Sequence, residues 1–144
     1  MQTFLSYPSF SLSAQCLDTK RLGKQRVEAY QILRVLVGES QGWKNHPAVK
    51  MWKGYEWALW SYGQDICVEW IRRGFKDTCL GKIEGMEGYD VVNASKFKRP
   101  EWLGDDSLHA SHRSNLLRKD PIHYSQFGWT EPDSLSYVWP KGEL

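Results

Sequence analysis

The chain has 144 residues with a formal net charge of +2, and its 41% hydrophobic and 25% charged residues are typical of a soluble globular domain. Its three cysteines form no Cys-x-x-Cys pair, which argues against a disulfide framework or a zinc site and favours a reducing cytoplasm. Neither a secretory signal nor the ~20 apolar residues of a membrane span can be found. We expect one domain over residues 1–144, with buried thiols, no metal ion and no membrane association.

The first expected helix follows an extended N-terminal segment, in which Pro8 prevents an early helix. A cap at Ser11 or Ser13 begins this helix, which runs to about Val37 and stops at Gly38. Gly23 lies in its middle and costs about 1 kcal/mol of helix propensity. It marks either a kink, a close approach of another chain or ligand, or a tolerated glycine.

One stripe of this helix carries two amines, a carboxylate and an amide. Lys20, Lys24, Glu28 and Gln31 recur at spacings of four, four and three residues, which places them on one side of a helix. Such a stripe is suited to binding a phosphate or moving protons. The alternative is a solvated ladder of ion pairs, which is common on exposed helices.

The second expected helix begins at a cap formed by Asn45 or His46, with Pro47 in its first turn, and continues to about Arg73. Residues 77–99 show no convincing apolar periodicity and are expected to form a long loop. A third helix is capped by Asp105 or Asp106 and extends to about Arg118, and an irregular aromatic tail follows it, with residues 133–139 on the surface of the helices. The expected fold is all-α, a single compact domain of three main helices with long loops.

Charge and aromatic content point to a polyanionic partner. Residues 20–34 carry five cations and one anion, and further basic clusters lie at residues 96–99 and 113–119. Segregated charge on a near-neutral chain predicts a one-sided basic surface, unless the clustering is by chance. Aromatic residues make up 14% of the chain, and most belong to the core. The candidates for stacking on or wedging into an opened duplex are Trp102, Tyr124, Phe127 and Trp129.

His46 is a candidate for proton transfer or phosphate binding. At a helix N-terminus the dipole disfavours the imidazolium, so its pKa is expected to be lowered. The alternative is that the histidine only caps the helix.

The stripe Lys20-x-x-x-Lys24-x-x-x-Glu28-x-x-Gln31 resembles the first helix of the pyrimidine-dimer DNA glycosylase family, the phage endonuclease V type. His46-Pro47 followed by Trp52, and the segment from Arg118 to Tyr124, are similar to further parts of that family. The resemblance covers most of the chain, and the match is closer to the broader, poorly characterised branch than to the dimer-specific enzyme.

The resemblance implies base excision without metal or cofactor. An amine attacks C1′ of a damaged nucleotide, displaces the base and forms an imine with the sugar, and a carboxylate assists ring opening before β-elimination breaks the strand. In the best-known member the amine is an α-amine exposed by removal of the initiator methionine. An α-amine titrates near 8, against about 10.4 for lysine, so more of it is unprotonated at neutral pH.

Two features depart from that member. Gln2 is too large to allow removal of Met1, so the free α-amine would belong to Met1 itself. An ungapped match places Gly23 opposite the catalytic glutamate and Cys16 opposite a histidine. Glu28 is the only carboxylate on the stripe and is therefore the substitute candidate.

These arguments assign the site residues. The candidate catalytic residues are Met1, Glu28, Lys24 and His46, with Lys20 or Lys24 as the alternative nucleophile. The candidate DNA-binding residues are Gln2, Lys20, Arg21, Arg26, Gln31, Trp52, Asn115, Arg118, Lys119 and Tyr124. We expect Lys24, Arg26, Arg118 and Lys119 to line one groove.

The predicted function is a monomeric DNA repair glycosylase with abasic-site lyase activity on damaged double-stranded DNA, in the cytoplasm of a bacterial or phage-infected cell. One alternative is a non-catalytic DNA-binding module on the same scaffold. The other is an enzyme that acts on modified bases or nucleotides.

Overall fold

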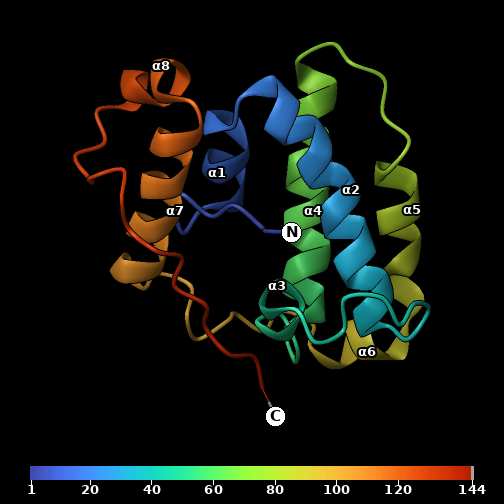
Figure 1. Ribbon diagram of the computed structural model, residues 1–144. Helices are drawn as coiled ribbons and strands as arrows, with labels where there is room; N and C mark the ends of the chain where they lie inside the picture. Colours follow the sequence, from blue (N-terminus) through green and yellow to red (C-terminus); the bar gives the residue numbers. More distant parts are fainter. Residues whose placement is uncertain (144) are drawn as a thin grey trace.

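The computed structural model describes residues 1–143, which form helices and no strands, so the predicted all-α class is confirmed. The helices are α1 (Phe10–Cys16), α2 (Thr19–Leu36), α3 (Pro47–Lys50), α4 (Glu56–Arg72), α5 (Leu80–Glu84), η1 (Gly85–Gly88), α6 (Asp90–Ala94), α7 (Asp106–Lys119), α8 (Pro121–Tyr124) and η2 (Ser125–Phe127). Helices α2 and α4 run side by side, and α1 and α5 also pack on α4 (Figure 1). Within this described part, no helix has the length and apolarity needed to cross a membrane.

The first expected helix is two helices, so the prediction of one continuous helix capped by Ser11 or Ser13 is wrong. Ser9 caps α1, and the chain is extended at Leu17 and Asp18 before α2 begins. The Asp18 carboxylate accepts a hydrogen bond from the Arg21 backbone N–H at 3.2 Å and caps α2. Apolar periodicity continues across this break, which is why the sequence pattern hides it.

The second expected helix is also divided. His46 caps the single turn of α3, as predicted, and Pro47 is its first residue. A turn over residues 51–54 follows α3, in which Gly54 adopts a positive φ of 86°, and α4 starts at Glu56. Residues 77–99 are not the featureless loop that was expected, because α5, η1 and α6 lie within them.

The extended N-terminal segment, residues 2–6, lies between α7 on one side and α2 and α4 on the other. The Phe4 N–H donates to Gln25 Oε1 of α2 at 2.9 Å, and the Phe4 carbonyl accepts from the Tyr62 hydroxyl of α4 at 2.8 Å. The Leu5 N–H donates to His112 Nδ1 of α7 at 2.8 Å. Chain termini are usually mobile, whereas side chains from three helices hold this one.

Helix α7 buries a polar face because it binds two extended segments. His109, His112 and Arg113 hold the N-terminal segment. On the same helix, Ser111 Oγ accepts from the Val138 N–H at 3.1 Å and Ser114 Oγ accepts from the Leu135 N–H at 3.0 Å. The tail therefore lies along the helices, as the sequence analysis expected.

Candidate functional site

A cleft opens where the N-terminus meets the exposed stripe of α2. We call it the amine cleft. It has a volume of about 370 Å3 and is lined by Met1, Gln2, Phe4, Lys20, Arg21, Lys24, Gln25, Glu28, Lys119 and Tyr137. Four basic side chains, the N-terminal amine and a single carboxylate share this space, so the cleft has a positive excess charge that suits an anionic ligand.

Glu28 lies directly beside the start of the chain. The backbone N–H of Gln2 donates to Glu28 Oε2 at 3.2 Å, so the α-amine of Met1 is one residue from this carboxylate. Lys24 Nζ is 3.6 Å from Glu28 Oε1. The Lys24 side chain is 75% exposed and that of Glu28 only 14%, so the lysine is free to move while the carboxylate is held. An amine and a fixed carboxylate are the pair that imine chemistry needs.

Gln25 fixes the position of this N-terminus, and the sequence analysis missed it. Its side chain is buried, accepts from Phe4 N–H and donates from Nε2 to the Gln2 carbonyl at 2.6 Å. The available signal was its position, because Gln25 lies on the buried face with Leu22, Ala29 and Ile32. A polar side chain on an apolar helical face must find a partner inside the protein.

His46 lies within electrostatic range of the N-terminal amine and of Glu28. Burial lowers the pKa of His46 and the N-terminal ammonium lowers it further, while the Glu28 carboxylate opposes the shift. The direction agrees with the sequence-based expectation, although burial rather than the helix dipole is the main cause. His46 Nδ1 accepts from the Ala48 N–H at 3.0 Å, so a neutral ring carries its proton on Nε2.

The remaining basic candidates divide into two groups. Lys20, Arg21 and Lys119 line the amine cleft with Lys24. Arg118 is not part of that lining, and its guanidinium donates to the Asp133 carbonyl at 3.2 Å and to Asn115 Oδ1, within electrostatic range of Tyr137. Gln31 lies outside the amine cleft, in a hollow of about 210 Å3 farther along α2.

Arg26 does not join the expected groove. Its guanidinium pairs with Asp77 at 2.6 Å and lies over the Trp70 ring at 4.3 Å, away from the cleft residues. It connects α2 to the segment that follows α4. The helix repeat explains the difference, because Arg26 and Lys24 are two residues apart and project about 200° apart.

Three DNA-binding candidates are interior side chains. Trp52 is fully buried and donates from Nε1 to Thr3 Oγ1 at 3.1 Å. Asn115 Nδ2 donates to the Leu135 carbonyl at 3.0 Å. The buried Tyr124 hydroxyl donates to Asp18 Oδ1 at 2.5 Å and supports the cap of α2. These side chains have no exposed surface with which to contact DNA in this conformation.

The proposed wedge residues pack on one another or in the core. Trp102 is buried and donates from Nε1 to the Met51 carbonyl at 3.0 Å. Trp129 stacks on Tyr124 and Phe127, with ring centroids 5.5 and 5.3 Å apart. The structure therefore favours the core interpretation of these aromatic side chains.

The second departure from the best-known family member, at Gly23 and Cys16, has a structural explanation. A Cβ at Gly23 would lie 2.9 Å from the Trp70 ring, so this position faces α4 and not the cleft. Cys16 is buried, and burial raises the pKa of its thiol to about 11. Glu28 is therefore the only carboxylate that lines the amine cleft among the described residues.

The chain belongs to the pyrimidine dimer DNA glycosylase family, whose family model matches residues 1–82. The match includes the N-terminal segment, the stripe of α2 and His46, and it ends within α5. Lys119 and the tail lie beyond it. No curated protein and no solved structure matches the chain significantly.

Proposed function

We propose that the protein excises damaged pyrimidines from double-stranded DNA and then cleaves the abasic strand, with the α-amine of Met1 as nucleophile and Glu28 as the acid–base residue. The observation that carries this proposal is the anchored N-terminal segment. Its hydrogen bonds to Gln25, Tyr62 and His112 hold the start of the chain, where the Gln2 N–H donates to Glu28. A catalytic pair held by buried partners loses little entropy when it meets a substrate.

The proposed reaction proceeds through an imine. The unprotonated amine attacks C1′ of the damaged nucleotide, and the base leaves with the electrons of the glycosidic bond. The Glu28 carboxylate takes one of the two protons on the attached nitrogen and delivers it to the ring oxygen as the C1′–O4′ bond breaks, which leaves a protonated imine at C1′. Loss of a C2′ proton then expels the 3′ phosphate. Water finally hydrolyses the imine and frees the amine.

The charge of the amine cleft supports a DNA substrate. Lys20, Arg21 and Lys119 line the cleft together with Met1 and would hold phosphates on either side of the extruded nucleotide. Gln2 adds a further group: its side chain is 5% exposed, it lines the cleft, and its Nε2 has no hydrogen-bond partner. Because Nε2 is itself buried, it reaches an acceptor on the DNA only when the Gln2 side chain turns toward the cleft. We propose that the protein acts as a monomer.

Borohydride trapping on abasic duplex DNA tests the proposal. Reduction converts the imine into a stable protein–DNA adduct, so wild-type protein is expected to give this adduct. Glu28→Gln removes the proton-transfer group and should lower turnover by at least ~100-fold. The matched control is Glu39→Gln, which breaks an exposed ion pair with Arg34 and should leave turnover unchanged. Absence of any adduct would indicate a DNA-binding module without chemistry, and a near-normal rate for Glu28→Gln would leave Glu28 as a structural partner of Lys24.

A further inference from the structure

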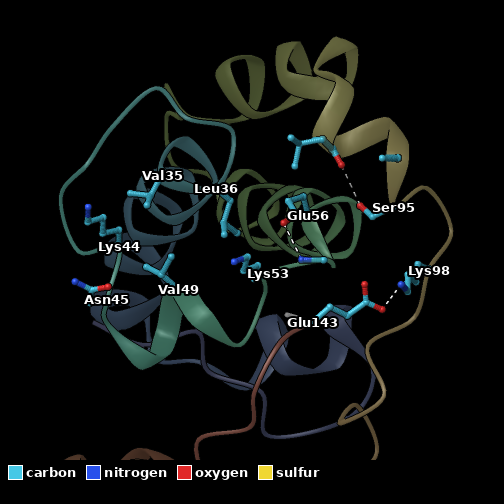
Figure 2. A pocket seen from close by; sticks show the side chains of 13 residues that line it. Val35, Leu36, Lys44, Asn45, Val49, Lys53, Glu56, Ser95, Lys98 and Glu143 are labelled. Carbon is cyan, nitrogen blue, oxygen red and sulfur yellow. Dashed lines mark hydrogen bonds and ion pairs between the residues drawn. The ribbon is translucent and has the colours of Figure 1, made fainter.

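A second, larger cleft lies at the other end of α2. It has a volume of about 740 Å3, and we call it the lysine cleft because Lys44, Lys53 and Lys98 line it. Figure 2 shows Lys44 on one side and Lys98 on the opposite side, with Lys53 between them. None of these residues lines the amine cleft.

Two strained aromatic residues are next in sequence to residues that line this cleft, and one of them, Trp43, lines the adjoining hollow that shares Val35 with it. Trp43 and Phe97 have φ angles of 65° and 64°, and they are the only residues other than glycine with positive φ in the described chain. Both side chains are exposed, by 62% and 74%. Trp43 precedes Lys44, and Phe97 lies between Lys96 and Lys98. Each aromatic ring is therefore next in sequence to a lysine that lines the cleft.

This coincidence requires an explanation from function. A bulky residue with positive φ is strained, and an exposed aromatic ring gains little from burial, so folding alone favours neither feature. Asn or Gly would fit these two backbone positions better. Strain of this kind persists at sites that bind a ligand.

The charges around the cleft favour an anionic ligand once the tail is displaced. Glu143 pairs with Lys98, and its backbone N–H donates to the Lys53 carbonyl at 2.7 Å. Glu56 also lines the cleft, accepts from the Gly54 N–H at 2.9 Å and lies within electrostatic range of Lys53, and burial raises the pKa of its carboxyl, which lessens its negative charge. Glu101 also lies within electrostatic range of Lys98. The Glu143 carboxylate thus occupies the position that a phosphate would take on Lys98.

We propose that the lysine cleft binds single-stranded DNA, with phosphates on Lys44, Lys53 and Lys98 and unstacked bases on Trp43 and Phe97. Aromatic rings stack on the faces of bases, and these faces are accessible only where bases are unpaired and unstacked. An intact duplex presents phosphates and base edges instead. The site is separate from the amine chemistry, and it does not depend on Met1 or Glu28.

Fluorescence anisotropy with labelled oligo-dT of ~12 nucleotides, a length that one such surface covers, tests this inference. The double variant Trp43→Gly, Phe97→Gly relieves backbone strain, so its melting temperature should be unchanged or higher. Its affinity for oligo-dT should fall by roughly 30-fold or more, because each of the two lost base stacks accounts for about 5-fold or more. Affinity for a blunt duplex of equal length should stay the same.

Further variants separate stacking from charge. Phe75→Ala is the matched aromatic control, because Phe75 is exposed, precedes Lys76 and stacks on Trp70 at 4.4 Å beyond the far end of α4. It should bind oligo-dT normally. Lys44→Ala combined with Lys98→Ala should flatten the salt dependence by about 0.7 per lost contact. Glu143→Gln should raise the affinity for oligo-dT by releasing Lys98.

Three results would overturn the inference: oligo-dT binding by the double glycine variant within twofold of wild type, an equal loss of duplex binding, or a Glu143→Gln variant that binds oligo-dT no more tightly. Borohydride trapping distinguishes a failure of this inference from a failure of the proposed amine chemistry. Phe97→Gly should trap abasic duplex as wild type does, whereas a wild-type protein that binds oligo-dT but forms no adduct would contradict the amine chemistry alone.

Discussion

Two buried histidines hold the segment that positions the candidate nucleophile, and both are neutral. His109 Nδ1 donates to the Leu5 carbonyl at 2.7 Å, and its Nε2 accepts from the Gly104 N–H at 3.0 Å. His112 Nδ1 accepts from the Leu5 N–H. Burial lowers the pKa of both, that of His112 to about 3. A second proton would place two donors opposite each other, at His112 against the Leu5 N–H and at His109 against the Gly104 N–H.

This pair predicts acid sensitivity in a defined pH window. Below pH ~6.5 the unfolded chain binds a proton at His112 and the folded protein does not, so the free energy of unfolding decreases as pH falls, by about 1.4 kcal/mol per pH unit for this histidine. His112→Asn keeps an acceptor for Leu5 and removes the titration. Urea unfolding between pH 6.5 and 4.5 should show that the free energy of unfolding depends less steeply on pH for this variant than for wild type. An equal slope would contradict the claim that a neutral His112 holds Leu5.

At the scale of elements, close packing of α2 on α4 sets the geometry of the stripe. Gly23 faces Trp70, and Trp70 is itself held on several sides: it stacks on Phe75 and donates from Nε1 to the Lys76 carbonyl at 2.7 Å. Gly63 of α4 similarly faces Ala29 and Ile83. Small residues at these contacts let the helices approach, which turns Lys20, Lys24 and Glu28 toward the N-terminus.

Gly23→Ala tests this packing. Alanine would gain about 1 kcal/mol of helix propensity, but its Cβ would lie 2.9 Å from a ring that has little room to move. We expect the steric cost to dominate and the free energy of unfolding to fall by about 1 kcal/mol. Thermal or urea unfolding measures the change. A stabilised variant would show that Trp70 moves readily.

Much of the helix content follows from local pattern, but the breaks between helices do not. The stripe from Lys20 to Gln31 and the third helix could be predicted because their spacing is regular. The helix break at Asp18 could not be predicted, because the apolar periodicity continues across it. The glycines at 81, 85 and 88 suggested a loop, yet none has a positive φ, and short helices form there because Ile83, Met86 and Val92 are buried.

The candidate site could be predicted only where its residues share a helix. Glu28 and Lys24 are neighbours on α2, and the spacing places them together. The contacts of Phe4 and Leu5 with Gln25, Tyr62 and His112 join residues 21 to 107 positions apart, which no local pattern shows. The burial of Tyr124 under Asp18 is equally non-local.

For the whole molecule, the basic surface is divided between two clefts at opposite ends of the exposed side of α2. Lys20 and Lys119 belong to the amine cleft, and Lys44 and Lys98 belong to the lysine cleft. The hollow that contains Gln31 shares Val35 with the lysine cleft. The net charge of +2 conceals this arrangement.

Duplex binding should depend on salt through the amine cleft. Lys20→Ala combined with Lys119→Ala should weaken binding to intact and damaged duplex alike and reduce the salt slope by about 0.9 per lost phosphate contact. Arg26→Gln is the control: it removes the cation that pairs with the buried Asp77 carboxylate and should cost about 3 kcal/mol of stability, the lower end for a buried pair, because two backbone N–H groups still hold Asp77. The salt slope of duplex binding should not change. If the double lysine variant and wild type had equal salt slopes, the duplex would contact the protein outside the amine cleft.

The central claim is that the α-amine of Met1 carries the reaction, and mapping the trapped adduct tests it most directly. After borohydride reduction on abasic DNA, mass spectrometry of the digested protein should find the sugar on the N-terminal peptide, at the α-amine. Acetylation of Met1, or one residue added before it, should abolish trapping while DNA binding persists. A sugar attached to Lys20 or Lys24, or undiminished trapping by the blocked protein, would contradict the account.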